Sequence, residues 1–384
     1  MAAASFNQSG GDLALTPGNN VGFSISSNSR NVHYTHSGGT ITLDGNNSAS
    51  IVKNAFLGIG NGTGISNTAT MTLTDGANLN VGTTVDRSGE IRIASTSESN
   101  GTLDVQGGIL TVGSASSQNK IYFFKAGASD APYLARMLQS GGTVITNGIQ
   151  FGGDVGTYDP TSSAFLHLSG GSLYVGAGGI TRGLAADELA VEILLEGGVL
   201  GASQSWSSSL DMQIGPQLII RAQDSVGTGR DVTLSGKISD DGETMGSLVK
   251  DGPGMLSLQG ANSFRGGLSI LNGSVEAKTN SSALGLGGVS MGGQASDGAT
   301  LLLGNIHANP IMVNSPGSGE VIIAANGPGS GFTLSGAITL NGDLTLKTFD
   351  NAINGDFRAV AGITGGVSGN GNLMLDNLGL AANA

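Results

Sequence analysis

One short pattern recurs seven times in the first half of the chain. An apolar residue, a variable residue and usually a second apolar residue lead into a glycine corner, after which an apolar residue follows. The copies begin at Phe6, Tyr34, Met71, Leu103, Met137, Leu166 and Ile193, between 27 and 37 residues apart. Self-similarity at this period is typical of repeat proteins. One such unit cannot bury its apolar side alone, so stacked neighbours must supply the core.

Apolar residues alternate at period two through most of the chain, as in Ile41–Leu43, Leu103–Val105 and Leu256–Leu258. This alternation predicts short strands, and glycine at their ends supplies the positive φ that a sharp bend requires. A sandwich or a barrel also has short strands and frequent turns. The near-constant length of the units favours a parallel β-helix instead. We therefore expect an all-β fold, a single β-solenoid of about 12–14 coils with strands of about three to six residues.

Composition excludes several classes of protein. The 67 glycines follow no three-residue period and accompany only 8 prolines, which excludes collagen. Hydrophobic residues make up 38% and charged residues 11%, unlike chains that are disordered through high charge. The net charge of −12 argues against a nucleic-acid partner. Cysteine is absent, so disulfides and thiolate metal sites are excluded.

The two ends carry no targeting signal that we recognise. Residues 1–5 lack the charged and apolar stretches of a signal peptide, and no apolar run approaches the ~18 residues of a membrane-spanning helix. We expect no membrane span in these residues, and we expect the chain to be a segment of a longer protein.

The sequence pattern of the repeat changes near residue 232. The run from Leu248 to Gly266 reads Leu-x-Lys-x-Gly-x-Gly-x-Leu-x-Leu-x-Gly-x-Asn-x-Phe-x-Gly. It resembles the autotransporter-associated β-strand repeat of bacterial surface proteins. A second, clipped copy starts at Phe332 and resumes at Val367. We thus divide the chain into residues 1–231, built from irregular Gly-Gly corner repeats, and residues 232–384, which we expect to continue the same β-helix with this repeat in truncated form.

The resemblance implies a right-handed β-helix that is secreted or displayed at the bacterial cell surface, as autotransporter passengers are. In that setting the role is structural. We expect a non-enzymatic extracellular solenoid that acts as a stalk, a fibre subunit or an adhesive passenger.

Metal and cofactor sites are not predicted. The four histidines are His33, His36, His167 and His307, and the first two, three residues apart on a strand, point to opposite faces. Residues 240–243 (Asp-Asp-Gly-Glu) have calcium-binding oxygens, but a solvated acidic loop explains them as well. Residues 152–159 match the calcium nonapeptide poorly, and residues 58–62 lack the Lys-Ser/Thr of a phosphate loop. We assign no metal, cofactor-binding or catalytic residue.

Two alternatives from other functional classes stay open. A polysaccharide lyase or glycosidase needs acidic residues together with Arg or Lys in one concave groove; the acidic candidates are Asp211, Asp224, Asp231, Asp240 and Asp241. A glycan-binding adhesin needs stacked exposed aromatic side chains; the candidates are Tyr122, Tyr133, Tyr158, Tyr174 and Trp206.

Three polar residues, Gln8, His36 and Gln139, occupy one slot of their units, where Leu73, Val105, Leu168 and Leu195 sit in the others. We expect them to form a structural ladder of side-chain hydrogen bonds. We also expect end-to-end self-association through terminal coils, because exposed strand edges recruit partners. A surface glycan is a further possible partner.

Overall fold

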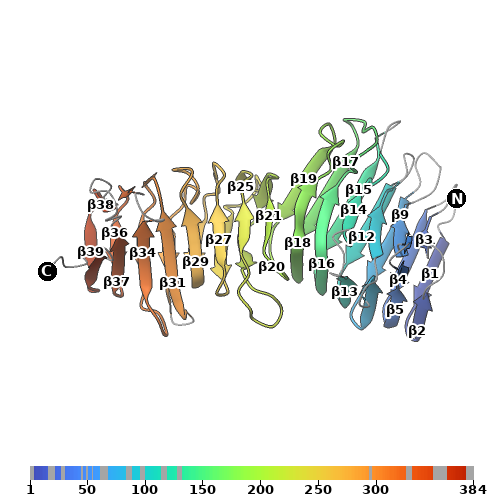
Figure 1. Cartoon of the computed structure of the whole chain (residues 1–384), viewed down its shortest axis with the longest axis horizontal. Coiled ribbons are helices and arrows are strands. Elements are labelled where there is room, and N and C mark those ends of the chain that lie inside the picture. Colours follow the sequence, from blue (N-terminus) through green and yellow to red (C-terminus); the bar gives the residue numbers. More distant parts are fainter. Residues whose placement is uncertain are drawn as a thin grey trace. The chain divides into compact units, whose positions relative to one another are not determined.

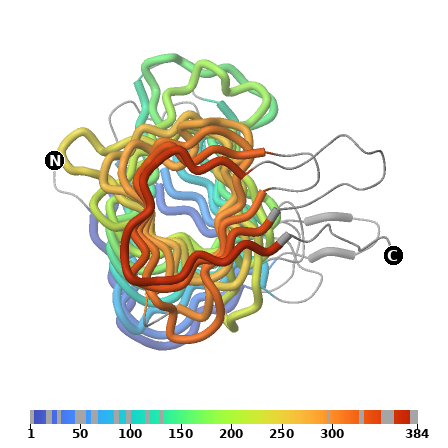
Figure 2. The backbone as a smooth tube through the Cα atoms, turned by 90° about the vertical axis from the view of Figure 1, so that its left-hand side faces the viewer, coloured from blue at the N-terminus to red at the C-terminus, as the bar shows by residue number. Residues whose placement is uncertain are grey.

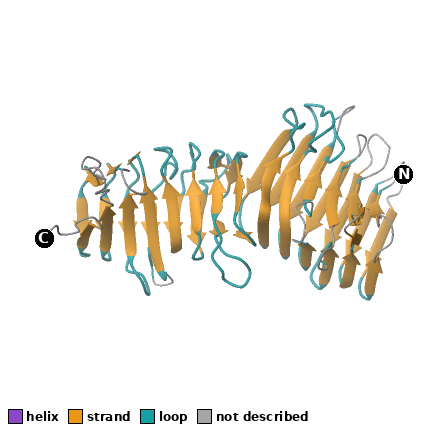
Figure 3. Cartoon of the chain, viewed as in Figure 1, coloured by secondary structure: helices purple, strands orange, loops and turns teal. Residues whose placement is uncertain are grey.

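The structure is a computed structural model that describes residues 4–15, 22–26, 31–44, 46–48, 51–53, 55–60, 68–83, 89–95, 100–113, 119–127, 132–293, 296–325, 331–348 and 361–377. The chain divides into two compact units, Met1–Leu210 (unit 1) and Asp211–Ala384 (unit 2). None of the described residues lies in a helix, and the chain is built from strands joined by loops (Figure 3). The predicted all-β fold with stacked parallel strands is confirmed. The expected change of repeat type at residue 232 stays a prediction.

Unit 1 repeats one path of three strands, each of which adds to a different parallel face (Figure 1). The first face contains β1 (Ala4–Gln8), β4 (Val32–His36), β9 (Thr68–Leu73), β12 (Asn100–Val105), β15 (Leu134–Gln139), β17 (Ser163–Leu168) and β19 (Ala190–Leu195). The second contains β2 (Asp12–Leu15), β5 (Gly39–Leu43), β10 (Ala77–Val81), β13 (Ile109–Val112), β20 (Val199–Ala202) and the first halves of β16 (Thr143–Phe151) and β18 (Ser172–Arg182). The third contains β3 (Gly22–Ile25), β8 (Ala55–Ile59), β11 (Gly89–Ile93), β14 (Ile121–Phe123) and the second halves of β16 and β18.

The strand register aligns the seven sequence repeats position by position. In the first face, the seven residues that begin the copies pair in an unbroken column: Phe6, Tyr34, Met71, Leu103, Met137, Leu166 and Ile193. Each copy is therefore one coil, and the alignment read from the sequence is confirmed. Two further elements of unit 1 are β21 (Trp206–Ser208) and the antiparallel hairpin of β6 (Asn46–Ser48) with β7 (Ile51–Lys53).

The corner between the first and second faces requires glycine. In every one of the seven copies the second corner residue is a glycine with φ between 64° and 86°, the left-handed region that side chains disfavour. At Gly142, a Cβ atom would lie 2.6 Å from the carbonyl carbon of Gly107 in the preceding coil. The corners therefore stack closely only because they lack side chains.

Unit 2 follows the same path with shorter coils, which lie over one another when viewed end-on (Figure 2). Its first face contains β22 (Met212–Ile214), β25 (Ile238–Asp240), β32 (Ile306–His307), β35 (Phe332–Leu334) and β38 (Ala361–Ile363). The second contains β23 (Leu218–Arg221), β26 (Ser247–Asp251), β28 (Gly267–Ile270), β30 (Val289–Met291), β33 (Ile311–Val313), β36 (Ile338–Leu340) and β39 (Val367–Gly369). The third contains β24 (Val232–Leu234), β27 (Met255–Leu258), β29 (Asn272–Ala277), β31 (Gly298–Leu303), β34 (Val321–Ala325), β37 (Leu344–Thr348) and β40 (Leu373–Asn377).

The interior of each coil is filled by alternate residues of its strands. In unit 2, the five residues that alternation places inside are all buried, with at most 1% exposure: Leu256, Leu258, Leu268, Ile270 and Val275.

Three sequence expectations need correction. From the sequence, residues 113–131 are expected to be an insertion between coils, but they contain β14. Strands β16 and β18 have nine and eleven residues, since each turns from the second face into the third without a break. From the sequence, residues 185–190 (Ala-Ala-Asp-Glu-Leu-Ala) are expected to form one helical turn, but they lie in two tight turns.

The polar residues of the Leu248–Gly266 run join coils to one another. Asn262 is buried; its Oδ1 accepts from Ile238 N (2.8 Å) and its Nδ2 donates to Ala283 O (2.7 Å). It thus bridges the coil before and the coil after, in the place where the first face has no strand. Phe264 fills the adjoining interior. These positions of the run are explained by packing and hydrogen bonding within the fold.

Candidate functional site

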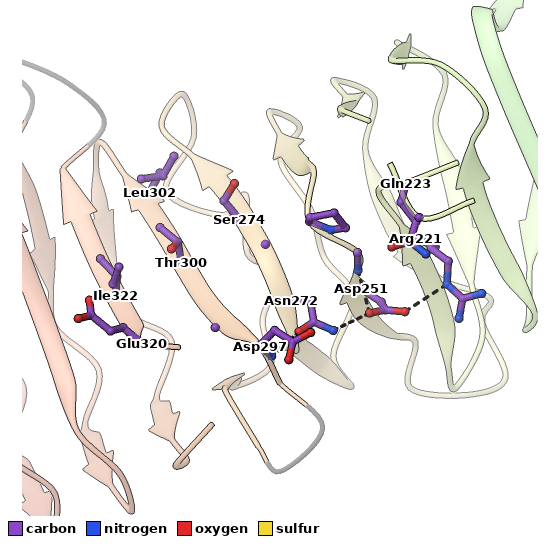
Figure 4. A pocket seen from close by; sticks show the side chains of 15 residues that line it. Arg221, Gln223, Asp251, Asn272, Ser274, Asp297, Thr300, Leu302, Glu320 and Ile322 are labelled. Atoms are coloured by element: carbon purple, nitrogen blue, oxygen red, sulfur yellow. Dashed lines mark hydrogen bonds and ion pairs between the residues drawn. The ribbon is translucent and has the colours of Figure 1, made fainter. Parts of the chain in front are cut away.

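An open groove of about 1000 Å³ lies in unit 2. It crosses successive coils beside the corner between the second and third faces (Figure 4). Its polar lining comprises Arg221, Gln223, Asp251, Asn272, Asp297 and Glu320. Ser274, Thr300 and Ile322 form part of its floor and pair in register on β29, β31 and β34. A groove with this course suits an extended ligand.

One wall of the groove is a hydrogen-bonded ladder of side chains. Asp251 accepts from Arg221 Nε (3.1 Å) and from Asn272 Nδ2 (2.9 Å) (Figure 4). Asn272 Oδ1 in turn accepts from the backbone N–H of Asp297 (2.7 Å), and Asp297 accepts from Ser318 Oγ (3.0 Å). Each rung joins one coil to the next. The wall therefore stabilises the stack whether or not a ligand binds.

The protonation of Asp251 fits a structural role. Burial alone would raise the pKa of its carboxyl group, but hydrogen bonds from Asn272 and Gly252, together with the nearby Arg221 guanidinium, hold the pKa below its ordinary value. A glycosidase acid must instead keep its proton near neutral pH. Asp251 is therefore an ionised hydrogen-bond acceptor. Glu320 differs from it, because its closest cation, Lys347 Nζ, lies 3.8 Å away and its side chain is 62% exposed.

The five acidic candidates named from the sequence do not line this groove. Each accepts a backbone N–H: Asp211 from Lys237, Asp224 from Val226 and Thr228, Asp231 from Met255, Asp240 from Gly246 and Arg265, and Asp241 from Glu243 and Thr244. Hydrogen bonds lower the pKa of Asp241, and they outweigh burial in lowering that of Asp240. These side chains therefore secure loops and corners.

The histidines lie apart, in separate hydrogen bonds. His33 contacts Thr72 Oγ1 (3.4 Å), His36 lies against Asn78 O (3.2 Å), His167 pairs with Glu196 (2.6 Å), and His307 lies against Ala277 O (3.2 Å). No group of three or more His, Asp or Glu side chains suited to a metal ion occurs within the described residues. Those residues also contain no helix that could cross a membrane.

The aromatic candidates are buried, which the sequence did not reveal. Tyr122, Tyr133, Tyr158, Tyr174 and Trp206 are each at most 8% exposed. Tyr158 Oη donates to Phe124 O, and Trp206 Nε1 donates to Gly201 O. The adhesin alternative requires exposed aromatic side chains, but in the folded coils backbone carbonyls supply the hydrogen-bond partners of Tyr158 and Trp206. They offer no stacking surface for a sugar.

The expected ladder of Gln8, His36 and Gln139 is wrong in its contacts, although the three residues do share one column. The direct neighbours of Gln139 in the column are Val105 and Leu168, so no polar side chain lies next to it there. Gln139 Nε2 donates instead to Ser172 O (3.0 Å), and His36 Nε2 to Asn78 O. Gln139 and His36 thus bond backbone carbonyls, whereas in unit 2 the side chain of Asn272 joins the Asp251 side chain to the backbone N–H of Asp297.

Comparison with known proteins identifies no relative. No family model, no curated protein and no solved structure matches the chain. The resemblance of residues 248–266 to the autotransporter-associated repeat therefore stays a prediction.

Proposed function

We propose that the protein is a non-enzymatic structural β-solenoid, a rigid segment that serves as a stalk, fibre subunit or adhesive passenger. The observation that carries this proposal is the use of its polar side chains: Asn262 bridges two coils, Asn272 bonds Asp251 of the preceding coil, and Lys250 caps a corner. Such contacts stiffen a stack of coils. The fold is thus suited to mechanical support and to the presentation of loops.

Two tests address this role. Limited proteolysis should cut only loops and leave the strands of each unit intact, since their backbone groups are paired in ladders. A panel of polysaccharide substrates should give no release of sugars or unsaturated products. Rapid digestion through the strands would contradict a rigid solenoid, and turnover of any polysaccharide would contradict a non-enzymatic role.

The finer architecture belongs to the same proposal. We infer right-handed coils, because parallel crossover connections are right-handed in about 98% of cases, and about 12–14 of them in all. We further propose secretion or display at the bacterial surface. The low share of charged residues and the lack of cysteine suit a solenoid stabilised by stacking alone. Localisation of the tagged protein in cell fractions tests this.

Self-association is the proposed partner interaction. In β38–β40, the side chains Val367, Leu373 and Leu375 are 43%, 40% and 79% exposed. Their register partners Ile338, Leu344 and Leu346 in the preceding coil are at most 4% exposed. In a polypeptide of residues 1–384, another coil seated here would bury them and extend the ladders. A monodisperse monomer at about ten micromolar or more, in the range where bare edges aggregate, would contradict this.

A carbohydrate-active enzyme is the second candidate. The observation in its favour is the groove, which brings Asp297 and Glu320 together with Arg221 along one side of unit 2. Among the residues that the structure describes, no aromatic side chain lines it. Glu320→Gln should abolish any turnover if the groove is catalytic, whereas Asp211→Asn, outside the groove, should not.

A further inference from the structure

Three basic side chains lie on the outer surface of the third face of unit 1, around β11 and β14. Arg92 lies between the fully buried Ile91 and Ile93, so alternation directs it outward. It pairs in register with Tyr122 of β14. Lys120 and Lys125 flank β14 on either side. The whole chain has only 16 lysines and arginines, so this grouping is a local exception in an acidic protein.

A buried carboxylate holds two of the three cations in place. The Glu90 side chain is 1% exposed; Arg92 contacts its Oε1 and Lys125 contacts its Oε2. Each cation also lies over an aromatic ring: the Arg92 guanidinium is 4.5 Å from the centre of Phe56, and Lys125 Nζ is 4.4 Å from the centre of Tyr122. Cation–π contact and ion pairing together restrict both side chains. The two cations are thus pre-ordered before any ligand arrives.

Both cations keep capacity for a second acceptor. Their side chains are 27% and 28% exposed. A guanidinium has five N–H donors and an ammonium three, while the contacts with Glu90 use only Nε and Nη2 of Arg92 and one contact of Lys125. Lys120 Nζ donates to Gln150 Oε1 (3.1 Å) in the next coil, and Gln150 donates to Asp154 (3.2 Å). Three cations therefore face two carboxylates, which leaves one positive charge.

We propose that Arg92, Lys120 and Lys125 form a binding site for the carboxylate or sulfate groups of an acidic polysaccharide. This inference rests on the proposed passive role of the solenoid and names the class of glycan and its place. Because the restraint of both cations exists before binding, little entropy is lost when an anion binds. A sugar anion contacts the site through its charge, and no exposed aromatic ring is required.

Other polyanions fit this surface less well. None of the most exposed large apolar side chains among the described residues lies on β8, β11 or β14, so nothing there inserts into a membrane. Nucleic acid binding relies on many phosphate contacts, and three cations supply few of them. At physiological salt the repulsion from the net charge of −12 is screened beyond about 8 Å, so a sparsely charged glycan binds through local contacts alone.

Binding of the full chain to hyaluronate and to κ-carrageenan, two sparsely charged polymers that carry carboxylate and sulfate groups respectively, tests the proposal by titration calorimetry at about physiological salt, with dextran as the uncharged polymer. The double variant Lys120→Gln/Lys125→Gln should weaken binding at least tenfold. The matched control is Lys278→Gln in unit 2, because Lys278 also pairs with a largely buried carboxylate, Glu276, at 3.0 Å. The affinity of Lys278→Gln for the acidic polymers should stay within twofold of that of the parent chain. All variants should keep the circular dichroism spectrum of the parent chain.

Three results would overturn the proposal: no binding to either acidic polymer, equal loss in the double variant and in Lys278→Gln, or equal binding of dextran. Tighter binding to duplex DNA or to anionic phospholipid vesicles would assign the site to another polyanion. Each of these results leaves the structural role intact, since that role is tested by proteolysis and turnover.

Discussion

Lys250 Nζ lies 2.8 Å from the backbone oxygen of Asn272, one coil further along unit 2. The same ammonium donates to the oxygens of Gly252 (2.7 Å) and Asp251 (3.2 Å). The side chain is fully buried, so the lysine caps a corner from the inside of the solenoid. In unit 1, Gln139 does the same for Ser172. In both units, inward-pointing polar side chains thus donate hydrogen bonds to backbone oxygens at the corners.

The first prediction concerns pH. Burial lowers the pKa of Lys250 from 10.5 to about 8. Between these values the unfolded lysine binds a proton that the folded one has released, so the free energy of unfolding rises with pH from about 8 toward 10.5. Up to pH 10 the gain is about 2–3 kcal/mol. Below pH 8 both forms are protonated, and this contribution no longer changes.

Lys250→Met should lack that rise. Urea unfolding at pH 7, 8, 9 and 10, compared between the parent chain and the variant, isolates the lysine because all other titrating groups are shared. If the free energy of unfolding changes with pH in the same way in the parent chain and in Lys250→Met, burial does not destabilise the ammonium of Lys250.

The second prediction concerns Asn262. Asn262→Ala leaves the buried N–H of Ile238 and the carbonyl of Ala283 without their partner, which should cost about 2–5 kcal/mol. Asn305→Ala is the control, because Asn305 bonds the backbone oxygen of Lys278 at an exposed place and should cost well under half as much. Chemical unfolding followed by circular dichroism measures both, and equal losses would refute a bridging role for Asn262.

The third prediction tests the corners. Gly142→Ala should destabilise unit 1 by about 2 kcal/mol or more, since φ is 64° and the new Cβ would meet the Gly107 backbone. Gly366→Ala in unit 2 should have little effect, because no atom lies within 4 Å of its Cβ position. Thermal melting of the two variants separates corner strain from a general effect of alanine. A stable Gly142→Ala chain would be inconsistent with this corner geometry.

The fourth prediction concerns the core. Leu258→Ala should lower the free energy of unfolding by about 2–5 kcal/mol, because the residue is fully buried on β27. Leu286→Ala, at a side chain that is 64% exposed, should change it by less than about 0.5 kcal/mol. If both variants unfold at the same denaturant concentration, the inward assignment of Leu258 is wrong.

Much of the fold follows from local rules that the sequence displays. Period-two alternation places Leu256, Leu258 and Val275 inside, because successive side chains of a strand point to opposite faces. Glycine at Gly39 and Gly142 marks corners, since only glycine adopts their φ without strain. The seven repeat starts predict the stacking register, because each coil needs the same residue over the same residue to close its core.

The strands, the corners and the direction of alternate side chains thus follow from local sequence patterns. Which residues meet between coils depends on how the coils stack. Asn272 lies between Asp251 and Asp297, and Glu90 between Arg92 and Lys125, through partners up to 35 residues away. The burial of Tyr158 and Trp206 was likewise invisible. The physical reason is that their hydrogen-bond partners are backbone groups of turns and other coils, whose positions exist only once the coils have stacked.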